Sequence, residues 1–361
     1  MSFVLKLSWF LSKMLDKREL SQFLLFSWQF IMQTLYVSQQ GCYVCLDGEL
    51  LLVKRRNTIL NEIQLPLLEM ILVFGKSQIT TQAIRSCLWR NISIAYLSRM
   101  GYCYGRILPI ERGYRQLSRY QQELSLVDRL IVARRIVQAK LKNSRVILMR
   151  QQRRQNSDVV AFAIQSLDYL TTKAGKAERI DQLMGYEGTG AAQYFSAFGY
   201  CLNSRDFVFA GRSRRPPGNA VNAMLSFGYQ VLWNHLLTLI ELQGLDPYSG
   251  CLHEGSYRHA ALASDLIEEF RAPLVDSLVL YLVNRNIMDV RDDFVYKNGG
   301  CYLNESGRPK FLKAFLQRME ETVTDDFGEA QPKWDLLHQQ VKEYKQFVYE
   351  PINGYSPYQI R

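Results

Sequence analysis

The spacing of hydrophobic residues changes once along this chain, near Gly113, and that change restricts the folds it can adopt. Residues 35–108 consist of short apolar runs bounded by glycines, a pattern typical of β-strands. The dipeptide Asp47-Gly48 separates two of these runs and is suited to a tight hairpin turn. Residues 80–91 are the exception, because their apolar positions have helical spacing. We therefore expect a mostly β region that contains one helix.

Beyond Gly113 the apolar residues recur every three or four positions, as on one face of an amphipathic helix. Similar stripes continue toward the C-terminus, interrupted by RSRRPPGN and by a turn at 297–300. The predicted fold class is therefore α+β, with an N-terminal β-rich domain at 32–113 and a larger, all-helical domain at 114–361. The helical stripes lie at 124–141, 157–170, 219–243, 260–287 and 331–348.

Residues 21–37, SQFLLFSWQFIMQTLYV, contain no charged residue and resemble a membrane segment at first sight. Serine and glutamine interrupt the stretch, so no apolar run approaches the ~20 residues that a membrane-spanning helix needs. No small-residue cleavage site follows, which argues against a signal peptide. We therefore expect a cytoplasmic protein with no membrane partner. Residues 1–31 form an uncertain leader that need not belong to the native protein, because Met32 begins a clearer strand pattern.

Basic residues outnumber acidic ones by 44 to 34, and the formal net charge of +10 favours a polyanionic partner such as nucleic acid. The predicted helix between Asp128 and Asp158 carries many lysines and arginines and no acidic residue. A solvated helix face usually alternates the sign of its charges, so a face of one sign favours contact with phosphates over simple solvation. The residues predicted to bind DNA are Arg145 on this helix and Arg212, Arg214 and Arg215, which precede two stiffening prolines.

Several acidic residues and one histidine lie in unexpectedly apolar or glycine-rich surroundings. Glu187 lies in YEGTGAAQYF, His253 in SGCLHEG, and Asp265 and Glu268 in ASDLIEEFRAP. Asp265 and Glu268 are three residues apart and would share one face of a helix, and Glu269, four residues after Asp265, would lie close by as a possible third carboxylate. Carboxylates with an imidazole suit Mg²⁺ or Mn²⁺, and the histidine favours manganese or zinc. Structural roles remain open as alternatives: a helix cap for Glu187, a core histidine for His253, and an exposed helix face paired with Arg271 for the last two acids.

Several longer segments occur together in one order along the chain. They are KLKNSRVIL, YEGTGAAQYF, RSRRPPGNAVNAMLSFGYQVL, GLDPYSGCLHEG and ASDLIEEFRAPLVDSLV, with MQTLYVSQQGCYVCLDGELLLV before them and YSPYQIR after them. Through these segments the chain resembles the CRISPR-associated adaptation integrases, metal-dependent proteins that insert new spacers into a CRISPR array. The resemblance extends from Met32 to the C-terminus. Asn219, Cys251 and the pair Arg258-His259 depart from the family's usual residues, and none of them is a proposed ligand.

The resemblance implies roles for both domains and for individual residues. The β-rich domain would mediate dimerisation, and the helical domain would be catalytic and bind DNA. The family's catalytic metal ligands fall on Glu187, His253 and Glu268, with Asp265 as an accessory acid on the same helix face. The implied cofactor is Mg²⁺ or Mn²⁺. The implied partners are DNA, as double-stranded spacer precursor and CRISPR repeat, a second copy of the chain, and a small ferredoxin-like companion protein.

The expected activity is that of a metal-dependent DNA endonuclease and integrase, which inserts short spacers into the CRISPR array by transesterification. A bound cation lowers the barrier of such a reaction by polarising the phosphoryl oxygen, and water as the nucleophile would give hydrolysis instead. Two alternatives stay open: a metal-dependent nuclease that acts on branched DNA in repair or recombination, and a catalytically silent DNA-binding scaffold. A substituted ligand would support the scaffold, whereas every candidate ligand is present here.

Overall fold

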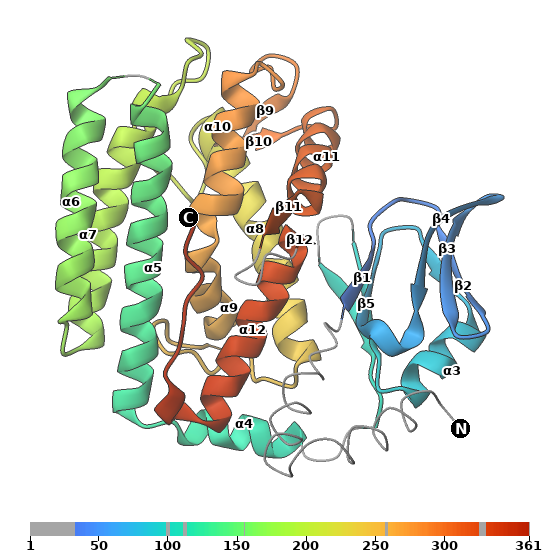
Figure 1. Ribbon diagram of the computed structural model, residues 1–361. Coiled ribbons are helices and arrows are strands. Elements are labelled where there is room, and N and C mark those ends of the chain that lie inside the picture. Colours follow the sequence, from blue (N-terminus) through green and yellow to red (C-terminus); the bar gives the residue numbers. More distant parts are fainter. Residues whose placement is uncertain are drawn as a thin grey trace, which may run out of the picture.

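The computed structural model of the protein describes residues 33–98, 102–110, 114–154, 156–256, 259–324 and 330–360 (Figure 1). The predicted leader, residues 1–31, lies outside these ranges. Within them, no helix combines the length and the apolar character that crossing a bilayer requires. Figure 1 shows the strands of the first part of the chain on one side of the molecule and the helices of the second part on the other.

The first part of the chain forms two four-stranded sheets. The first sheet has the order β1-β5-β7-β8, in which β1, β5 and β7 run parallel and β8 antiparallel. The second has the order β4-β3-β2-β6, an antiparallel meander with β6 parallel to β2. The strands are β1 Gln33–Val37, β2 Tyr43–Asp47, β3 Leu50–Arg55, β4 Thr58–Gln64, β5 Leu68–Phe74, β6 Gln78–Ile79, β7 Ser93–Leu97 and β8 Cys103–Ile107.

Two local predictions in this part of the chain are confirmed. Strands β2 and β3 form a hairpin, and its turn residue Gly48 has a φ of 58°. This left-handed conformation is unfavourable for residues with a Cβ, which explains the glycine. The helix predicted within 80–91 is α3 (Thr81–Trp89), and the Thr80 hydroxyl caps it by accepting a hydrogen bond from the N–H of Ala83.

Strand β5 is buried on both faces because the first sheet is a middle layer. Ile71 and Val73 pack into the core between the two sheets, which α3 also joins. Met70, Leu72 and Phe74 point the other way and pack against the helices. This double burial explains why β5 has a continuous apolar run after Glu69, MILVF, instead of an alternating sequence.

The second part of the chain is mostly helical. Its 27-residue helix α5 packs along α6 and α7 and contributes a row of fully buried side chains to the core (Figure 1). The α-helices are α4 Tyr114–Glu123, α5 Leu126–Gln152, α6 Asp158–Gly175, α7 Ile180–Phe198, α8 Ala220–Leu242, α9 Ala261–Leu266, α10 Ser277–Asn284, α11 Gly307–Glu320 and α12 Lys333–Tyr349. The short 3₁₀ turns of this part are η2 Gly199–Cys201, η3 Ile267–Glu269 and η5 Pro351–Asn353, and η4 Arg271–Asp276 is a π-helix; the 3₁₀ turn η1 Leu65–Leu67 lies in the first part, between β4 and β5.

The prediction of an all-helical second domain is wrong in one respect, because this part also contains two small antiparallel sheets. They consist of β9 (Phe294–Lys297) with β10 (Gly300–Leu303), and β11 (Thr322–Thr324) with β12 (Ala330–Pro332). Between β9 and β10, Asn298 and Gly299 both have positive φ, 49° and 72°. Two such residues make the tight turn that joins hairpin strands, so the Asn-Gly pair forms a hairpin where only a turn was predicted.

Trp334 at the start of α12 packs at the junction between the sheets and the helices. Its side chain is 2% exposed, and its ring stacks on Tyr36 of β1 with ring centroids 4.9 Å apart. The ring centroid of His235, on α8, lies 4.8 Å away, and that of Phe74, on β5, lies 5.9 Å away. Strands from the first part and helices from the second therefore share one core.

The shared core predicts a large loss of stability for Trp334→Ala. Removing a fully buried aromatic side chain leaves a cavity and should lower the free energy of unfolding by about 3–5 kcal/mol. The matched control is Trp89→Ala, because Trp89 is 87% exposed; its effect should stay within about 0.5 kcal/mol. Urea denaturation followed by circular dichroism measures both. Equal, small effects of the two substitutions would show that the junction contributes little to stability.

Candidate metal centre

Glu187 lies on α7, and a glycine allows this helix to approach α5 closely. A Cβ at Gly190 would lie 2.3 Å from Cδ2 of Leu141 on α5, too close for any side chain there without displacement of Leu141. Glu187 and Gly190 are three residues apart, so they face the same side of α7. At Gly188 a Cβ would have no neighbour within 4 Å. The motif YEGTGAAQYF therefore uses Gly190 to bring the Glu187 carboxylate to α5.

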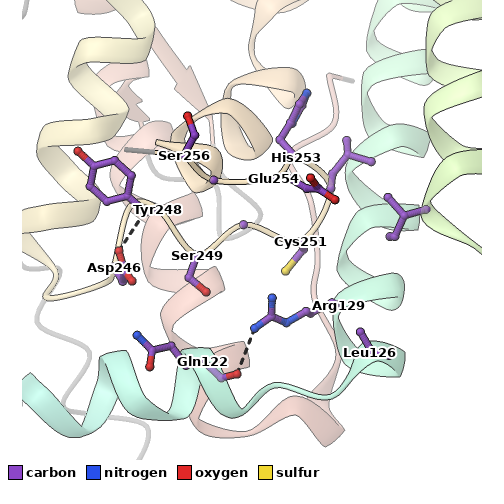
Figure 2. A pocket seen from close by; sticks show the side chains of 14 residues that line it. Gln122, Leu126, Arg129, Asp246, Tyr248, Ser249, Cys251, His253, Glu254 and Ser256 are labelled. Carbon is purple, nitrogen blue, oxygen red and sulfur yellow. Dashed lines mark hydrogen bonds between the residues drawn. The ribbon is translucent and has the colours of Figure 1, made fainter. Parts of the chain in front are cut away.

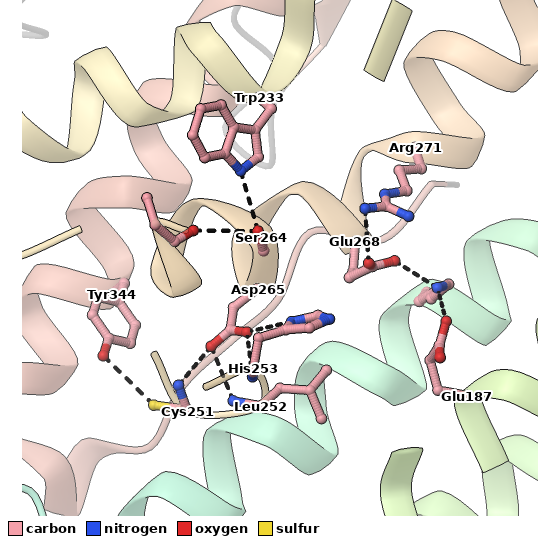
Figure 3. Close-up of polar contacts among 12 residues, drawn as sticks. Glu187, Trp233, Cys251, Leu252, His253, Ser264, Asp265, Glu268, Arg271 and Tyr344 are labelled. Carbon is pink, nitrogen blue, oxygen red and sulfur yellow. Dashed lines mark hydrogen bonds and ion pairs between the residues drawn. The ribbon is translucent and has the colours of Figure 1, made fainter. Parts of the chain in front are cut away.

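Lys140 of α5 connects Glu187 to Glu268. Its Nζ forms an ion pair with Oε1 of Glu187 and another, at 2.6 Å, with Oε2 of Glu268 (Figure 3). The side chains of Lys140, Glu187 and Glu268 are 11%, 17% and 3% exposed, so water screens these charges only partly. Two of the predicted ligands, from distant parts of the sequence, therefore meet at one ammonium group.

Arg271 is the second cation beside Glu268. Its Nη2 lies 3.1 Å from Oε1 of Glu268, and its guanidinium carbon lies 4.9 Å from the ring centroid of Tyr229. Burial by itself raises the pKa of Glu268, but the charges of Arg271 and Lys140 outweigh burial and lower the pKa to about 2. Glu268 is therefore ionised at neutral pH, as a metal ligand has to be.

Asp265 holds His253 and the loop that carries it. Nδ1 of His253 lies 2.7 Å from Oδ1 of Asp265, and this carboxylate also accepts hydrogen bonds from the N–H groups of Cys251, Leu252 and His253 (Figure 3). Burial lowers the pKa of His253, but the hydrogen bond to Asp265 and the nearby carboxylate charges raise it above the ordinary value. Because Asp265 occupies Nδ1, Nε2 is the ring nitrogen left to bind a cation.

The single helix predicted at 260–287 is interrupted, which separates Asp265 from Glu268. Helix α9 ends at Leu266 and continues as the 3₁₀ turn η3 and the π-helix η4 before α10 begins. A 3₁₀ turn has three residues per turn, so the side chains rotate relative to an α-helix. Asp265 faces the loop of His253, whereas Glu268 faces Lys140. Asp265 therefore holds the His253 ring and does not share the helix face of Glu268, contrary to the prediction of one shared face.

Among the side chains that the structure describes, no three His, Cys, Asp or Glu residues are grouped closely enough to hold a metal ion. The Lys140 ammonium lies between the two carboxylates that would share the cation. The residue types still fit a divalent cation, since two carboxylates and an oriented imidazole form a suitable donor set. Oε2 of Glu268 is buried and has the Lys140 ammonium 2.6 Å away as its partner, so a cation at this oxygen would have to displace that ammonium.

A pocket of about 1030 Å³ lies beside His253. Figure 2 shows that His253 and Glu254 lie at one end of it, while Arg129 and Gln122 line the side formed by α4 and α5. Tyr248 supplies an aromatic ring from the loop that precedes His253. This volume is sufficient for a nucleotide, and a guanidinium with an aromatic ring suits a phosphate and a base.

The arginines predicted to bind DNA have different surroundings. Arg214 and Arg215 are exposed on the segment that precedes α8. Arg212 is partly buried, and its guanidinium donates hydrogen bonds within its own loop and to α8. Arg145 is paired with Asp168 of α6 at 3.4 Å. The exposed pair is better placed to reach phosphates, and Arg212 shapes the loop that carries this pair.

Comparison with known proteins identifies the family of this chain. The family model for the CRISPR associated protein Cas1 matches residues 35–317. The chain belongs to the Cas1 family. A CRISPR-associated endonuclease Cas1 of Chlorobaculum tepidum is 30% identical over 344 residues, which cover 91% of this chain and 98% of that protein. An exonuclease Cas4/endonuclease Cas1 fusion of Geobacter sulfurreducens is 34% identical over 302 residues, 80% of this chain but only 53% of the fusion.

Solved structures share the fold of this chain. A chain of a partial Cas6-RT-Cas1–Cas2 complex superposes with a TM-score of 0.79 at 23% identity, covering 91% of this chain and 99% of that one. A casposase bound to its integration product superposes with a TM-score of 0.69 at 24% identity, covering 91% and 100%. The likeness confirms an α+β fold with a strand-rich first part and a mostly helical second part.

Lys140 is the residue of this centre that the sequence pattern does not single out. It begins the segment KLKNSRVIL, one of those that carried the resemblance, but on its helix it is one of many basic residues. Only the three-dimensional structure distinguishes it, by its two ion pairs. Arg271, in contrast, could be anticipated as a partner of the neighbouring acids because it follows Glu268 by three residues.

The contact between Asp265 and His253 predicts a lower pKa of His253 in the variant Asp265→Asn. The neutral amide removes a charge and a hydrogen-bond acceptor that raise the pKa of His253, so that pKa should fall and the imidazole should be neutral at lower pH. A ¹³C-resolved NMR titration of the histidine ring signals measures the change, with the His253 signal assigned from His253→Gln. The signal of His338, which contacts Thr34 in the first part of the chain, serves as the internal control. An unchanged or higher pKa of His253 would contradict this account of its orientation.

Proposed function

We propose that this protein joins the 3′-hydroxyl of a short DNA duplex to a phosphodiester of a CRISPR repeat, with Glu187, His253 and Glu268 as the ligands of a catalytic cation. As a member of the Cas1 family it is an enzyme of CRISPR adaptation, a DNA endonuclease and integrase. The choice of these three residues as ligands is supported by one observation. Glu187 and Glu268 meet at Lys140, and Asp265 orients His253 beside them.

The cation that best suits these donors is Mg²⁺ or Mn²⁺. Carboxylate oxygens are preferred by both ions, and an imidazole nitrogen favours Mn²⁺ over Mg²⁺. A bound divalent cation would polarise a phosphoryl oxygen and stabilise the negative charge that develops on the departing oxygen. The carboxylate of Glu268 is already ionised, because Arg271 and Lys140 lower its pKa to about 2, so no proton has to leave it before a cation binds.

The chain's own residues supply orientation and positive charge around the reacting phosphodiester. Asp265 fixes the loop from Cys251 to His253 through three backbone hydrogen bonds, so the imidazole keeps one direction. Arg271, stacked on Tyr229, adds a fixed positive charge next to Glu268. Such preorganised charges stabilise negative charge in a transition state without first having to reorient.

DNA would approach this centre across a basic surface. Arg214 and Arg215 are exposed near the segment that leads into α8, and the net charge of +10 favours binding to phosphates. These contacts would position DNA without reading its sequence. The solved casposase is described with an integration product, and the family-related complex contains Cas2 together with Cas1. We extend both to this chain as proposals: a DNA substrate of the same kind, and a small ferredoxin-like companion protein.

The proposed homodimer uses the β-rich first part of the chain, residues 32–113, and leaves residues 114–361 for DNA and catalysis. Support comes from the edge strand β8, along which Tyr104 is 70% exposed, next to Tyr102 at 60%. An exposed aromatic edge strand is a surface that proteins usually cover by pairing with another chain. A second copy of the chain is the occupant that we propose for it.

Strand transfer in vitro tests the proposed reaction. The reaction contains a labelled duplex with free 3′-hydroxyls, a supercoiled plasmid with leader and repeat, the companion protein, and Mg²⁺ or Mn²⁺. Glu187→Ala, His253→Ala and Glu268→Ala should each reduce joining at least about 100-fold while DNA binding is retained, because each removes a ligand of the cation. The control is Glu178→Ala, which changes an exposed glutamate outside the centre.

The products of this reaction also distinguish the alternatives. An integrase produces longer, joined strands, whereas a nuclease specific for branched DNA produces only shorter ones, and a silent scaffold produces neither. Full joining activity in the three ligand variants would contradict the assigned centre.

The position of Lys140 predicts competition between its ammonium and the cation. In Lys140→Met the two carboxylates lose their internal counter-ion, so Mn²⁺ should bind about tenfold more tightly, which corresponds to ~1.4 kcal/mol. Without metal the variant should unfold at a lower temperature than the wild type, because the carboxylates then repel each other. Calorimetric titration with Mn²⁺ and thermal denaturation without metal measure the two effects. Lys142→Met, an exposed lysine one residue beyond Leu141, is the control; weaker Mn²⁺ binding by Lys140→Met would refute competition.

A further inference from the structure

The last residues of the described chain run back along α5 to the metal centre. In Figure 1 the C-terminal segment follows α12, turns near α4 and ascends between α5 and α12. We call residues 355–360 the C-terminal strap. Tyr355 at its beginning is 3% exposed and donates its hydroxyl proton toward Glu269, while Gln340 of α12 donates hydrogen bonds to the Tyr355 hydroxyl and to the carbonyl of Ser356. The strap is therefore fixed to the body of the protein along its length.

Glu269, the residue that follows Glu268, is bound by the strap through both carboxyl oxygens. The Tyr355 hydroxyl donates to Oε1 at 2.5 Å, and the N–H of Tyr358 donates to Oε2 at 2.7 Å. Glu269 is 0% exposed, so these protein donors replace the water that its carboxyl would otherwise bind. The ring of Tyr358 also stacks on Phe270, with centroids 5.0 Å apart and an interplanar angle of 15°.

Asn143 ties the strap to the same helix that carries Lys140. Its Nδ2 donates to the backbone carbonyls of Glu269, at 2.8 Å, and Tyr358, at 3.0 Å. Its Oδ1 accepts a hydrogen bond from the N–H of Ile360 at 2.9 Å. Asn143 is 1% exposed and lies three residues after Lys140 on α5. One buried amide therefore connects α5, η3 and the strap.

We propose that the C-terminal strap is a positioning element of the proposed metal centre, which holds the backbone of Glu268 where its carboxylate meets Lys140 opposite Glu187. The physical reason is that Glu268 and Glu269 are consecutive residues in the short 3₁₀ turn η3. Anchoring the Glu269 side chain and backbone carbonyl fixes the backbone that carries Glu268. The strap touches no reacting atom, and its role rests on the proposed function of the centre.

The first test is a chain that ends at Gly354, with the heptapeptide YSPYQIR supplied separately. Supports of metal ligands typically contribute 10–100-fold to metal affinity, so the shortened chain should bind Mn²⁺ at least about tenfold more weakly in a calorimetric titration. A saturating concentration of the peptide should restore the affinity, which a general loss of folding would not permit. Glu187→Ala in the full-length chain is titrated in parallel, and Ile352→Ala, a side chain 95% exposed just before the strap, is the control.

A series at Tyr358 keeps the test valid if the shortened chain does not fold. Tyr358→Phe keeps both the stacked ring and the backbone donor and should bind Mn²⁺ as the wild type does. Tyr358→Ala removes the ring, and Tyr358→Pro removes the ring and the N–H that binds Glu269. Mn²⁺ affinity should therefore fall in the order Phe, Ala, Pro.

The parallel titrations separate the two proposals. Wild-type Mn²⁺ affinity in the shortened chain or throughout the Tyr358 series, together with lost affinity in Glu187→Ala, overturns the role of the strap and leaves the centre in place. Wild-type affinity in Glu187→Ala overturns the centre and the strap's role together.

Discussion

In the segment from residue 265 to residue 276, every acidic side chain is buried, and the contacts that these side chains need hold the surrounding helices and loops together. Asp265, Glu268, Glu269 and Asp276 are at most 3% exposed, and a buried carboxylate is costly unless protein groups replace its water. Each of them recruits a different part of the chain. Asp265 binds the loop of His253, Glu268 binds α5 through Lys140, Glu269 binds the C-terminal strap, and Asp276 accepts hydrogen bonds from tyrosines on α7 and α8. The helical part of the molecule is assembled around this one segment.

These carboxylates differ in charge because their partners differ. Glu268 faces two cations, which lower its pKa to about 2 despite burial. Glu269 and Asp276 have mainly neutral hydroxyl and N–H partners, and burial raises their pKa to about 8 and about 6. In the proposed centre, the acid that would bind a cation is therefore the one beside lysine and arginine, while Glu269 and Asp276 accept hydrogen bonds from neighbouring segments. The interruption of the helix by η3 and η4 is what allows adjacent acids to face such different partners.

The sequence predicts much of this arrangement and misses the parts that depend on long-range pairing. The change in the spacing of apolar residues predicts a strand-rich part followed by a helical part, and the Asp47-Gly48 dipeptide predicts the β2–β3 hairpin. Both signals can be read because they depend on residues close together in the sequence. The β9–β10 hairpin was missed because its strands are short, although its Asn-Gly turn was visible. Lys140 and the C-terminal strap could not be predicted from spacing, since a basic residue on a basic helix and a polar chain end have many possible partners. Their roles become visible only when residues far apart in sequence lie in contact.

The charges of the centre connect metal binding to DNA binding. Glu187 and Glu268 carry negative charge, and Lys140 and Arg271 carry positive charge, so the group is close to neutral before a divalent cation enters. A bound cation leaves an excess of positive charge in a site that water screens only partly, which is unfavourable without an anion. The phosphodiester of DNA is that anion, and an ammonium displaced from the carboxylates can pair with it. Cation and DNA should therefore strengthen each other's binding, by the same factor in both directions. In the proposed centre, Lys140 and Arg271 would therefore make the binding of the cation depend on the DNA substrate.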